Sequence, residues 1–287
     1  MVKLVNEDIK TREVLEWEGL HVFHFLFSSC SQKLRIFLAL KGVDWESHEI
    51  DLMTNENLSD YYLGINPRGL LPSIVHNGDV HIESNDILTY LESVYPEPQL
   101  TPESARDKVA QLLKHEDELH LDLRALSFRF VFNPPHNPKS PEDLKVYATA
   151  GSGTVNGKKD DRVGVEIDFW ETYADGGITD EVAKAAAEKF RSIFNELDEL
   201  LGNQEYLLPE GLSVLDIAWF IYANRLGLAG YPIGRLHPNL GKWYERMEQM
   251  PEIVREIELP PPVREKFAAT RAQHLGEGMH LEAVAGL

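Results

Sequence analysis

The stretch HVFHFLFSSCSQKLRIFLALKG, residues 21–42, decides the fold of the first third of the chain. Residues 21–27 are apolar and aromatic and end abruptly at two serines, which is typical of a short buried strand. Apolar residues recur at helical spacing over residues 31–41, and a glycine follows where the helix should end. With a second strand over residues 45–52, the pattern predicts a right-handed strand–helix–strand unit.

A hairpin and a helix follow this unit. Asn66-Pro67-Arg68-Gly69 interrupts the chain, and strands over residues 71–75 and 80–82 flank Asn77-Gly78, which is the strongest short hairpin signal. A helix over residues 84–94 completes the segment. The element order is therefore βαβ, α, ββα, an α/β domain.

The second half of the chain is predominantly helical in pattern. Thr101-Pro102 resembles a helix start, because threonine caps a helix and proline is tolerated at its first position. Residues 133–164 differ, since they hold Pro134, Pro135, Pro138 and Pro141, then Gly151-Ser152-Gly153 and Gly157. We expect most of this insertion to be a loop with one helical patch. After Pro251 we expect a short helix, a stop at Pro260-Pro261-Pro262 and a tail of weak pattern.

These patterns predict an α/β domain followed by an all-helical domain. The predicted segments are an N-terminal extension (1–19), an α/β domain (20–98), a helical domain (99–250) with an insertion (133–164), and a C-terminal extension (251–287).

Composition limits the partners and the compartment. The 287 residues carry a net charge of −19, which argues against a nucleic acid or an anionic membrane as partner. The single cysteine, Cys30, excludes an internal disulfide and leaves too little thiol for a structural zinc site. No transmembrane helix or secretory signal is expected, and we expect a cytoplasmic protein without a metal.

The first candidate site is the serine-rich junction between strand and helix, Ser28-Ser29-Cys30-Ser31. A thiol bound there would face a helix N-terminus and accept a hydrogen bond from a hydroxyl, and both effects favour the thiolate. The alternative is purely structural. In that case Ser31 is the helix cap, Ser28 and Ser29 are turn residues, and Cys30 is a small buried filler.

Two further candidates follow in chain order. A cis Leu71-Pro72 bond would turn the Leu71 main chain outward to pair with an extended peptide, although proline at a strand start is also ordinary edge chemistry. Ser84 as a helix cap would leave N–H groups for a carboxylate, and Glu83 can accept an ammonium group. Plain capping is the alternative for this pair.

Residues 21–95 resemble the glutathione-binding domain of the glutathione transferase superfamily, which has a thioredoxin-like fold. The resemblance rests on the serine-rich junction, on Asn-Pro-x-x-x-x-Pro ending at Pro72, and on Glu83-Ser84. Ser28 to Ser31, with Arg35-Ile36 and Ala39-Leu40-Lys41-Gly42, is similar to the zeta class, the maleylacetoacetate isomerases. Ser213-Val214-Leu215-Asp216-Ile217-Ala218 resembles the capping box of the family's helical domain.

The resemblance implies glutathione as cosubstrate and assigns roles to the candidates. Ser28 is the first choice for the thiolate-stabilising hydroxyl, with Ser29 and Cys30 beside it and Ser31 as the competing choice. Leu71, before Pro72, would pair with the cysteinyl unit, and Glu83 with Ser84 would hold the γ-glutamyl end. Many serine-type relatives carry His or Lys where this chain has Gly69, so Arg68 or another cation would have to bind the glycyl carboxylate.

The helical domain would hold a small hydrophobic electrophile. His115, His120, Arg124, Phe128 and Arg129 lie on its first long helix, which borders that pocket in the family; the alternative is a solvated helix face. We name His120, Arg124 and Phe128 for the pocket.

The long insertion is similar to that of bacterial etherase-type glutathione transferases, which cleave aryl ethers of lignin fragments. The implied activity is conjugation or ether cleavage by a homodimer. The alternatives are cis–trans isomerisation, a non-catalytic binding protein, and a disulfide reductase with Cys30 as nucleophile.

Overall fold

The computed structural model describes residues 2–134, 138–150 and 154–287. Contacts divide the chain into two compact units, each described by itself: unit 1 holds residues 1–96 and 136–176, and unit 2 holds residues 97–135 and 177–287. The predicted insertion thus falls mainly in the α/β unit, whereas we had placed it in the helical domain.

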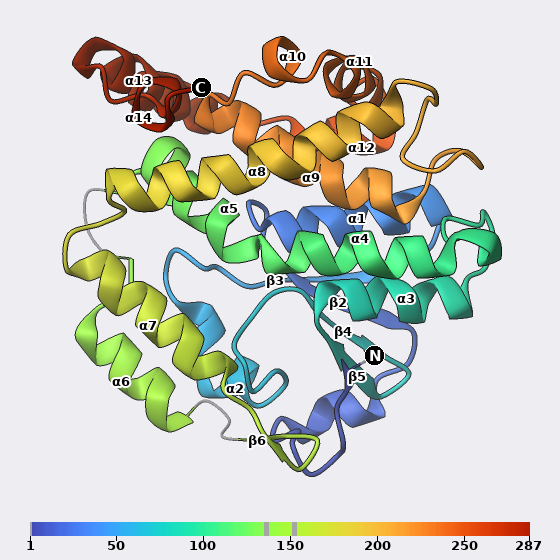
Figure 1. Ribbon diagram of the computed structural model, residues 1–287. Helices are drawn as coiled ribbons and strands as arrows, with labels where there is room; N and C mark the ends of the chain where they lie inside the picture. The colour runs from blue at the N-terminus through green and yellow to red at the C-terminus, as the bar shows by residue number, and fades with distance from the viewer. Residues whose placement is uncertain (1, 135–137, 151–153) are drawn as a thin grey trace. The chain divides into compact units, whose positions relative to one another are not determined.

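Unit 1 is built on a five-stranded sheet of order β1-β5-β4-β2-β3 (Figure 1). Its strands are β1 (Val2–Lys3), β2 (Leu20–His24), β3 (Glu46–Glu49), β4 (Ser73–His76) and β5 (Asp79–Ile82). β2 and β3 are parallel, and the other pairs are antiparallel. The predicted βαβ unit and hairpin are therefore present. The N-terminal extension adds β1 at the edge of the sheet, because Val2 pairs with Ile82.

Helices α1 (Ser29–Lys41) and α3 (Ser84–Val94) pack together beside the sheet. Two buried lysines of α1 reach across to α3: Lys33 Nζ lies 2.7 Å from Asn85 Oδ1, and Lys41 Nζ lies 2.7 Å from Glu92 Oε2. The short elements η1 (Arg12–Glu16), η2 (Glu56–Leu58) and α2 (Asp60–Leu63) complete the unit. A core cluster that includes Phe23, Tyr62 and Val80 holds it together.

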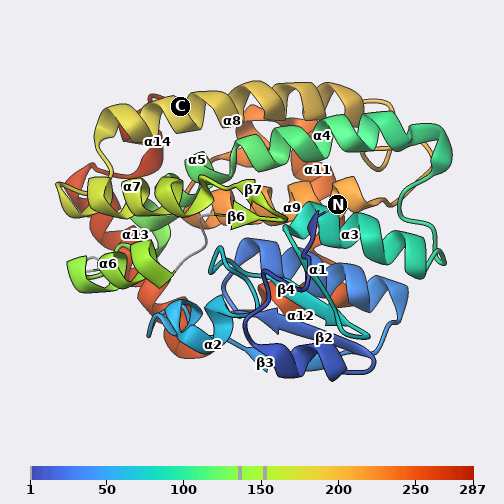
Figure 2. The same ribbon diagram turned by 90° about the horizontal axis from the view of Figure 1, so that it is seen from below.

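The insertion is more regular than we predicted. It forms α6 (Pro141–Ala150), the hairpin β6 (Thr154–Val155) and β7 (Lys158–Lys159), and α7 (Arg162–Ala174), whereas Pro135 and residues 151–153 lie outside the described residues. Tyr147 of α6 and Val163 of α7 pack against Leu58 and Leu63. This docking explains the correction, because apolar residues on both helices gain partners distant in sequence. Figures 1 and 2 show α6 and α7 side by side, and α6 contacts η2, which precedes α2.

Unit 2 is helical. It contains η3 (Glu103–Ala105), α4 (Arg106–Glu118), α5 (His120–Ser127), the π-turn η4 (Phe128–Phe132), α8 (Asp180–Leu201), α9 (Val214–Ala229), α10 (Ile233–Leu236) and α11 (Pro238–Met247). α9 is buried nearly all round and is contacted by α4, α5 and α11. The expected capping box is present at its start, with the Ser213 N–H donating to Asp216 Oδ2 at 2.9 Å.

The C-terminal extension is also folded, contrary to the predicted weak tail. It forms α12 (Pro251–Ile257), α13 (Pro261–Glu277) and α14 (Leu281–Ala285). Phe267 of α13 packs on Phe132, with ring centroids 5.7 Å apart, and α14 packs on α8 with Leu281 fully buried. The predicted short helix after Pro251 and its stop before Pro260 are present, and Pro261 then starts α13, because a helix tolerates proline in its first turn.

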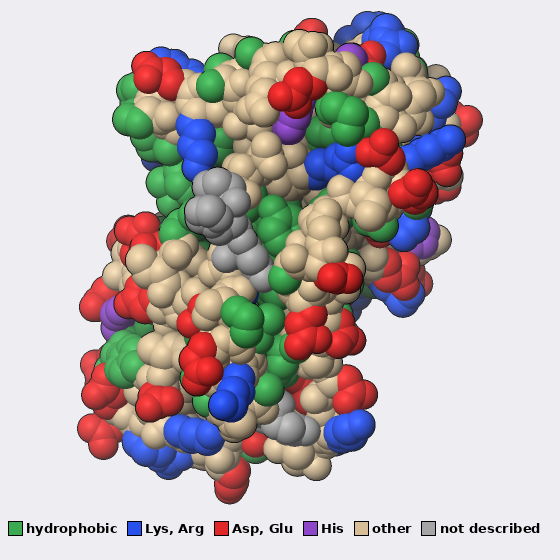
Figure 3. All heavy atoms as spheres, turned by 90° about the vertical axis from the view of Figure 1, so that its left-hand side faces the viewer, with side chains coloured by type: hydrophobic (Ala, Val, Ile, Leu, Met, Phe, Trp, Pro, Cys, Tyr) green, Lys and Arg blue, Asp and Glu red, His purple; other side chains and the backbone are tan. Residues whose placement is uncertain are grey.

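No helix in the described part of the chain is long and apolar enough to cross a bilayer. On the face shown in Figure 3, acidic side chains are interspersed with Lys and Arg among the residues drawn in colour.

Candidate functional site

The serine-rich junction lies where β2 runs into α1. Ser28 is the N-cap of α1, and its Oγ accepts the Ser31 N–H at 3.3 Å. The structural alternative had given this cap to Ser31. The Ser31 hydroxyl is instead fully buried and accepts the Phe25 N–H at 3.3 Å. Of these two hydroxyls, only that of Ser28 is partly exposed.

Arg35 braces the loop that carries Ser28. Its Nη1 donates to the Phe25 carbonyl at 3.1 Å and its Nη2 to the Leu26 carbonyl at 3.0 Å. The Ser28 N–H donates back to the Phe25 carbonyl at 3.2 Å. The junction is therefore held by hydrogen bonds to its main-chain carbonyls, which place Ser28 at the start of α1. Ser29 is buried and Cys30 is half-buried.

The Leu71–Pro72 peptide is cis. Just before it, the Leu70 carbonyl accepts hydrogen bonds from Tyr62 Oη at 2.6 Å and Asn66 Nδ2 at 2.8 Å. Within the described residues, the Leu71 N–H and C=O make no hydrogen bond. The turn is thus fixed through its neighbours, and the Leu71 main chain stays available to pair with an extended peptide.

Glu83 and Ser84 lie between β5 and α3. The predicted helix over residues 84–94 is present, but Glu83 and not Ser84 occupies the N-cap position, so Ser84 is the first helical residue. Glu83 has a φ of +67°, a left-handed conformation that is uncommon outside glycine and costs backbone energy. Within the described residues the Ser84 hydroxyl makes no hydrogen bond.

Arg68 lies in an ion-pair network with Glu83 and with Asp160 from the insertion. Its Nη1 lies 2.6 Å from Glu83 Oε1, while Nε and Nη2 form a bidentate pair with Asp160 at 3.0 and 2.6 Å. Burial opposes the charge on Arg68, but the hydrogen bonds and charges of Asp160 and Glu83 outweigh it and raise the pKa of Arg68. Its guanidinium is therefore already paired, which differs from the role we expected at the glycyl carboxylate.

The backbone and the surroundings of Gly69 leave no room for a cationic side chain at this position. Its φ is +61°, and a Cβ atom would lie 3.1 Å from the Asn57 carbonyl oxygen and 3.3 Å from a ring atom of Tyr147. The Tyr147 hydroxyl also donates to the Arg68 carbonyl. The insertion therefore fills the space that a side chain at position 69 would need.

Neither Asp160 nor Tyr147 of the insertion was predicted from the sequence. Asp160 lies 92 positions from Arg68, and no local pattern links the two. For Tyr147 the only signal was an apolar ring three residues after Leu144, which is the spacing of a helix face.

The second group of candidates lies in unit 2, where the predicted long helix is broken at Leu119 into α4 and α5. His120 Nδ1 lies 3.0 Å from Tyr222 Oη, which orients the imidazole. Arg124 is four residues further on and shares the face of His120. Phe128 begins the π-turn and packs edge-on against Phe132. Arg129 pairs with Asp180 and donates to the Ile178 carbonyl.

Comparison with known proteins supports the same two-part layout. The glutathione S-transferase N-terminal domain model matches residues 27–94, and the C-terminal domain model matches residues 180–246. A zeta-class glutathione S-transferase of Euphorbia esula is 39% identical over 89 residues, which are 31% of this chain and 40% of that protein. The chain spans only about two fifths of the length of the plant relatives it matches.

A longer match is to Protein LigF of Sphingobium sp. strain SYK-6, 28% identical over 223 residues, 74% of this chain and 83% of that protein. The crystal structure of beta-etherase LigF aligns with a TM-score of 0.67 and 25% identity, covering 83% of this chain and 98% of the other. The predicted thioredoxin-like and helical fold is thereby confirmed. Since the two domain models match in order, and one relative follows the chain through both, this chain belongs to the glutathione S-transferase superfamily.

Proposed function

We propose that this chain is a glutathione transferase in which the Ser28 hydroxyl stabilises the glutathione thiolate for attack on a hydrophobic electrophile. The observation that carries the proposal is the state of the Ser28 hydroxyl. Its oxygen accepts the Ser31 N–H, and a hydroxyl that accepts still has its own proton to donate. That proton is the donor that a thiolate at the start of α1 needs.

The neighbouring groups fit this role less well. The Ser31 hydroxyl is fully buried against the Phe25 N–H, and Ser29 is buried. Cys30 is half-buried at the helix start, where a thiol is activated, so the disulfide-reductase alternative depends on it. Ser28 is accordingly the first choice, and Cys30 defines the competing chemistry.

The rest of the tripeptide would be bound by unit 1. The Leu71 main chain would pair with the cysteinyl unit, and the N–H of Ser84 with the Glu83 carboxylate would bind the γ-glutamyl end. Arg68 would contribute indirectly by holding the Glu83 carboxylate in position, because its guanidinium lies 2.6 Å from that carboxylate. We assign no cation to the glycyl carboxylate, since Arg68 is already paired and Gly69 has no side chain.

A free thiol with a pKa near 8.5 is only about 3% ionised at pH 7, and lowering that pKa by about two units corresponds to roughly 2.7 kcal/mol. A hydrogen bond to a charged group is worth about 1.5–3 kcal/mol. The Ser28 hydroxyl can therefore supply a large part of the shift, and the partial positive charge of the α1 N-terminus supplies the rest.

For the electrophile we propose an aryl ether, because LigF is the relative that follows this chain over most of its length. The thiolate would attack the carbon that carries the aryl ether oxygen. A carbon–sulfur bond forms, the carbon–oxygen bond breaks, and a phenolate leaves and takes a proton from water. His120, Arg124 and Phe128 are proposed to line the pocket, with His120 oriented by Tyr222.

The zeta-class likeness of the N-terminal domain favours a second candidate, cis–trans isomerisation by transient addition of the thiolate to a double bond. It uses the same Ser28 chemistry but returns glutathione unchanged. A homodimer is proposed in both cases on family grounds.

The test compares Ser28→Ala with Cys30→Ser and Ser29→Ala in three assays: conjugation of a reactive aryl halide, cleavage of a β-aryl ether, and reduction of a glutathione mixed disulfide. Ser28→Ala should lower kcat/KM in the first two assays by about 10- to 100-fold. It should also raise the pKa in the pH–rate profile, because less thiolate forms near neutral pH. Cys30→Ser and Ser29→Ala should stay near wild type.

A loss in Cys30→Ser confined to disulfide reduction would favour the reductase instead. Binding of glutathione without turnover of any electrophile would leave a binding protein and refute the transferase.

A further inference from the structure

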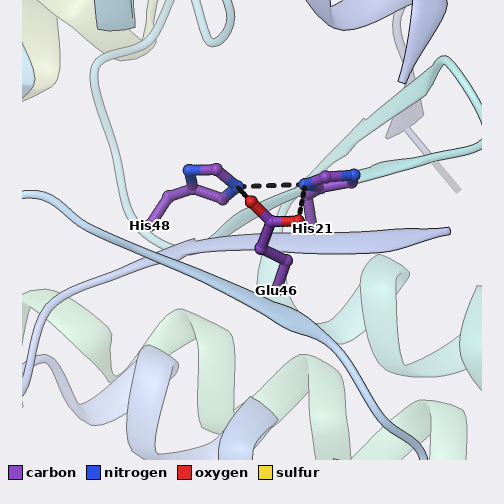
Figure 4. Close-up of side chains that lie close together, drawn as sticks. All are labelled: His21, Glu46 and His48. Atoms are coloured by element: carbon purple, nitrogen blue, oxygen red, sulfur yellow. Dashed lines mark hydrogen bonds and ion pairs between the residues drawn. The ribbon is translucent and has the colours of Figure 1, made fainter. Parts of the chain in front are cut away.

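His21, Glu46 and His48 form a side-chain cluster away from the proposed glutathione site. β2 and β3 are parallel, with His21 opposite Glu46 and Phe23 opposite His48. Because side chains alternate along a strand, residues 46 and 48 project from the same face as residue 21. Figure 4 shows the two imidazoles and the carboxylate pointing toward one another. The cluster lies at the start of β2, whereas Ser28 follows the end of that strand.

The spacing of the three side chains matches that of metal ligands. His21 Nδ1 lies 3.0 Å from His48 Nε2, Glu46 Oε2 lies 3.6 Å from His21 Nδ1, and Glu46 Oε1 lies 3.8 Å from His48 Nε2. In a tetrahedral zinc site the metal–ligand bonds are about 2.0–2.1 Å, so neighbouring ligand atoms lie about 3.3 Å apart. The two imidazole nitrogens are therefore spaced like two corners of one coordination tetrahedron, and the Glu46 carboxylate, which presents a different oxygen to each imidazole, lies close enough to supply a third ligand.

The hydrogen bond on the far side of His21 fixes its tautomer. His21 Nε2 lies 2.9 Å from the Glu18 carbonyl oxygen, which can only accept, so Nε2 carries the proton and the Nδ1 lone pair faces His48. Metal-binding histidines commonly donate their second N–H to a carbonyl in this way. His21 is accordingly set up as a ligand through Nδ1.

The ring of His48 is held by aromatic neighbours. Trp17 stacks on it at 5.0 Å and Phe23 at 4.7 Å between ring centroids. Without a metal, His48 Nε2 donates to His21 Nδ1. A metal would replace the proton between the two imidazoles. The proton on His48 Nε2 would move through solvent to His48 Nδ1, so the imidazole of His48 stays neutral. Glu46 supplies one negative charge and is exposed, which leaves a fourth position open to water.

We propose that His21, Glu46 and His48 form a binding site for a divalent transition metal of the zinc class. Two imidazoles and one carboxylate suit zinc and its neighbours and are poor ligands for Mg²⁺ or Ca²⁺. Such a metal joins β3, at the edge of the sheet, to its neighbour β2. A zinc ion there would hold the edge strand of unit 1 in place.

The test is a Zn²⁺ titration of the chelator-treated full chain, without glutathione because its thiol binds zinc. Binding is followed by competition with a chromogenic chelator and by the melting temperature. We expect one equivalent bound and a rise in melting temperature. Glu46→Gln and His48→Asn should each weaken the affinity at least about tenfold and abolish that rise. The chain has eleven histidines, so the matched control is His115→Asn, which removes a histidine on α4 in unit 2 and should leave the zinc affinity unchanged.

Trp17 gives a second readout, since its ring centroid lies 4.5 Å from that of His21. Cu²⁺ bound at the site should quench the fluorescence of Trp17. The Trp17→Phe variant should lose this quenching, and the Glu46→Gln variant should need a higher Cu²⁺ concentration to show it. Glu46 is exposed, so Glu46→Gln is expected to fold even if His48→Asn does not. Zinc affinity that is unchanged in Glu46→Gln, or equally lost in His115→Asn, would overturn the site and indicate adventitious binding. Neither readout uses transferase activity, so the proposed function can fail independently.

Discussion

Replacing Asp160 by Asn tests whether the insertion is energetically coupled to the rest of unit 1. The Asp160 side chain is 10% exposed and that of Arg68 is 15% exposed, and the two form a bidentate pair. Breaking a buried ion pair by removing one partner costs about 3–5 kcal/mol. Arg68 would keep Glu83, which lies 2.6 Å from Nη1, and the pair is not fully buried. We therefore expect the variant to lose about 2 kcal/mol of stability.

The adjacent carboxylate provides the control. Asp161 is 77% exposed and pairs only at the surface with Lys159, so Asp161→Asn should change stability by less than about 0.5 kcal/mol. Both variants remove one charge from neighbouring positions, which cancels any effect of net charge.

Melting temperature and limited proteolysis of the β6–β7 hairpin are the assays. A loss of about 2 kcal/mol corresponds to a fall of roughly 4–8 °C for a unit of this size. We also expect faster cleavage of the hairpin and a higher KM for glutathione in Asp160→Asn, because Glu83 would lose its fixed geometry. Equal melting temperatures for the two variants, within 1 °C by this scale, would refute the inferred coupling.

Three further substitutions test individual contacts. Gly69→Ala should cost about 2 kcal/mol or more, because a left-handed alanine is strained and its Cβ meets Asn57 and Tyr147, whereas Gly157→Ala, with a similar φ and open space, should cost only about 1 kcal/mol in chemical denaturation. Asp216→Asn should lower the melting temperature through a loss of about 3 kcal/mol, since the buried carboxylate accepts from two N–H groups, a hydroxyl and an indole, and an amide cannot accept all four. Burial lowers the pKa of His81 to about 4, so its neutral form stabilises the fold above pH 6.5 and at most about 3 kcal/mol is lost as the pH falls toward 4; His81→Phe should flatten this part of the stability–pH profile, and an unchanged profile would contradict it.

The sequence was most informative where the signal is local. The β2–α1–β3 unit follows from an apolar run, two serines and one helical period, and the hairpin follows from Asn77-Gly78. The capping box at Ser213 was also visible, because its partners are three residues apart. The serine-rich junction was predicted as a site with Ser28 as the first choice by resemblance, but the burial of the competing Ser31 could be seen only in the loop geometry.

The sequence was least informative where folding depends on distant contacts. Tyr147 and Val163 dock on Leu58 and Leu63, and this gain outweighs the local preference of proline and glycine for loops. The proposed metal site at His21, Glu46 and His48 was not predicted, because only cysteine was weighed as a zinc ligand. His21 and His48 are 27 positions apart and become neighbours through the parallel register of two strands.

The insertion and Gly69 are best understood as one structural arrangement. The ring of Tyr147 lies over the left-handed Gly69, and its hydroxyl binds the carbonyl of Arg68, whose guanidinium pairs with Asp160. A cation at position 69 would displace that ring, so the docked insertion and the bare glycine require each other. Tyr147→Ala should therefore make Gly69→Ala less costly than it is in the wild type, since the crowding at Tyr147 is removed while the backbone strain remains. Strictly additive losses in this double-mutant cycle would show that the two positions are independent.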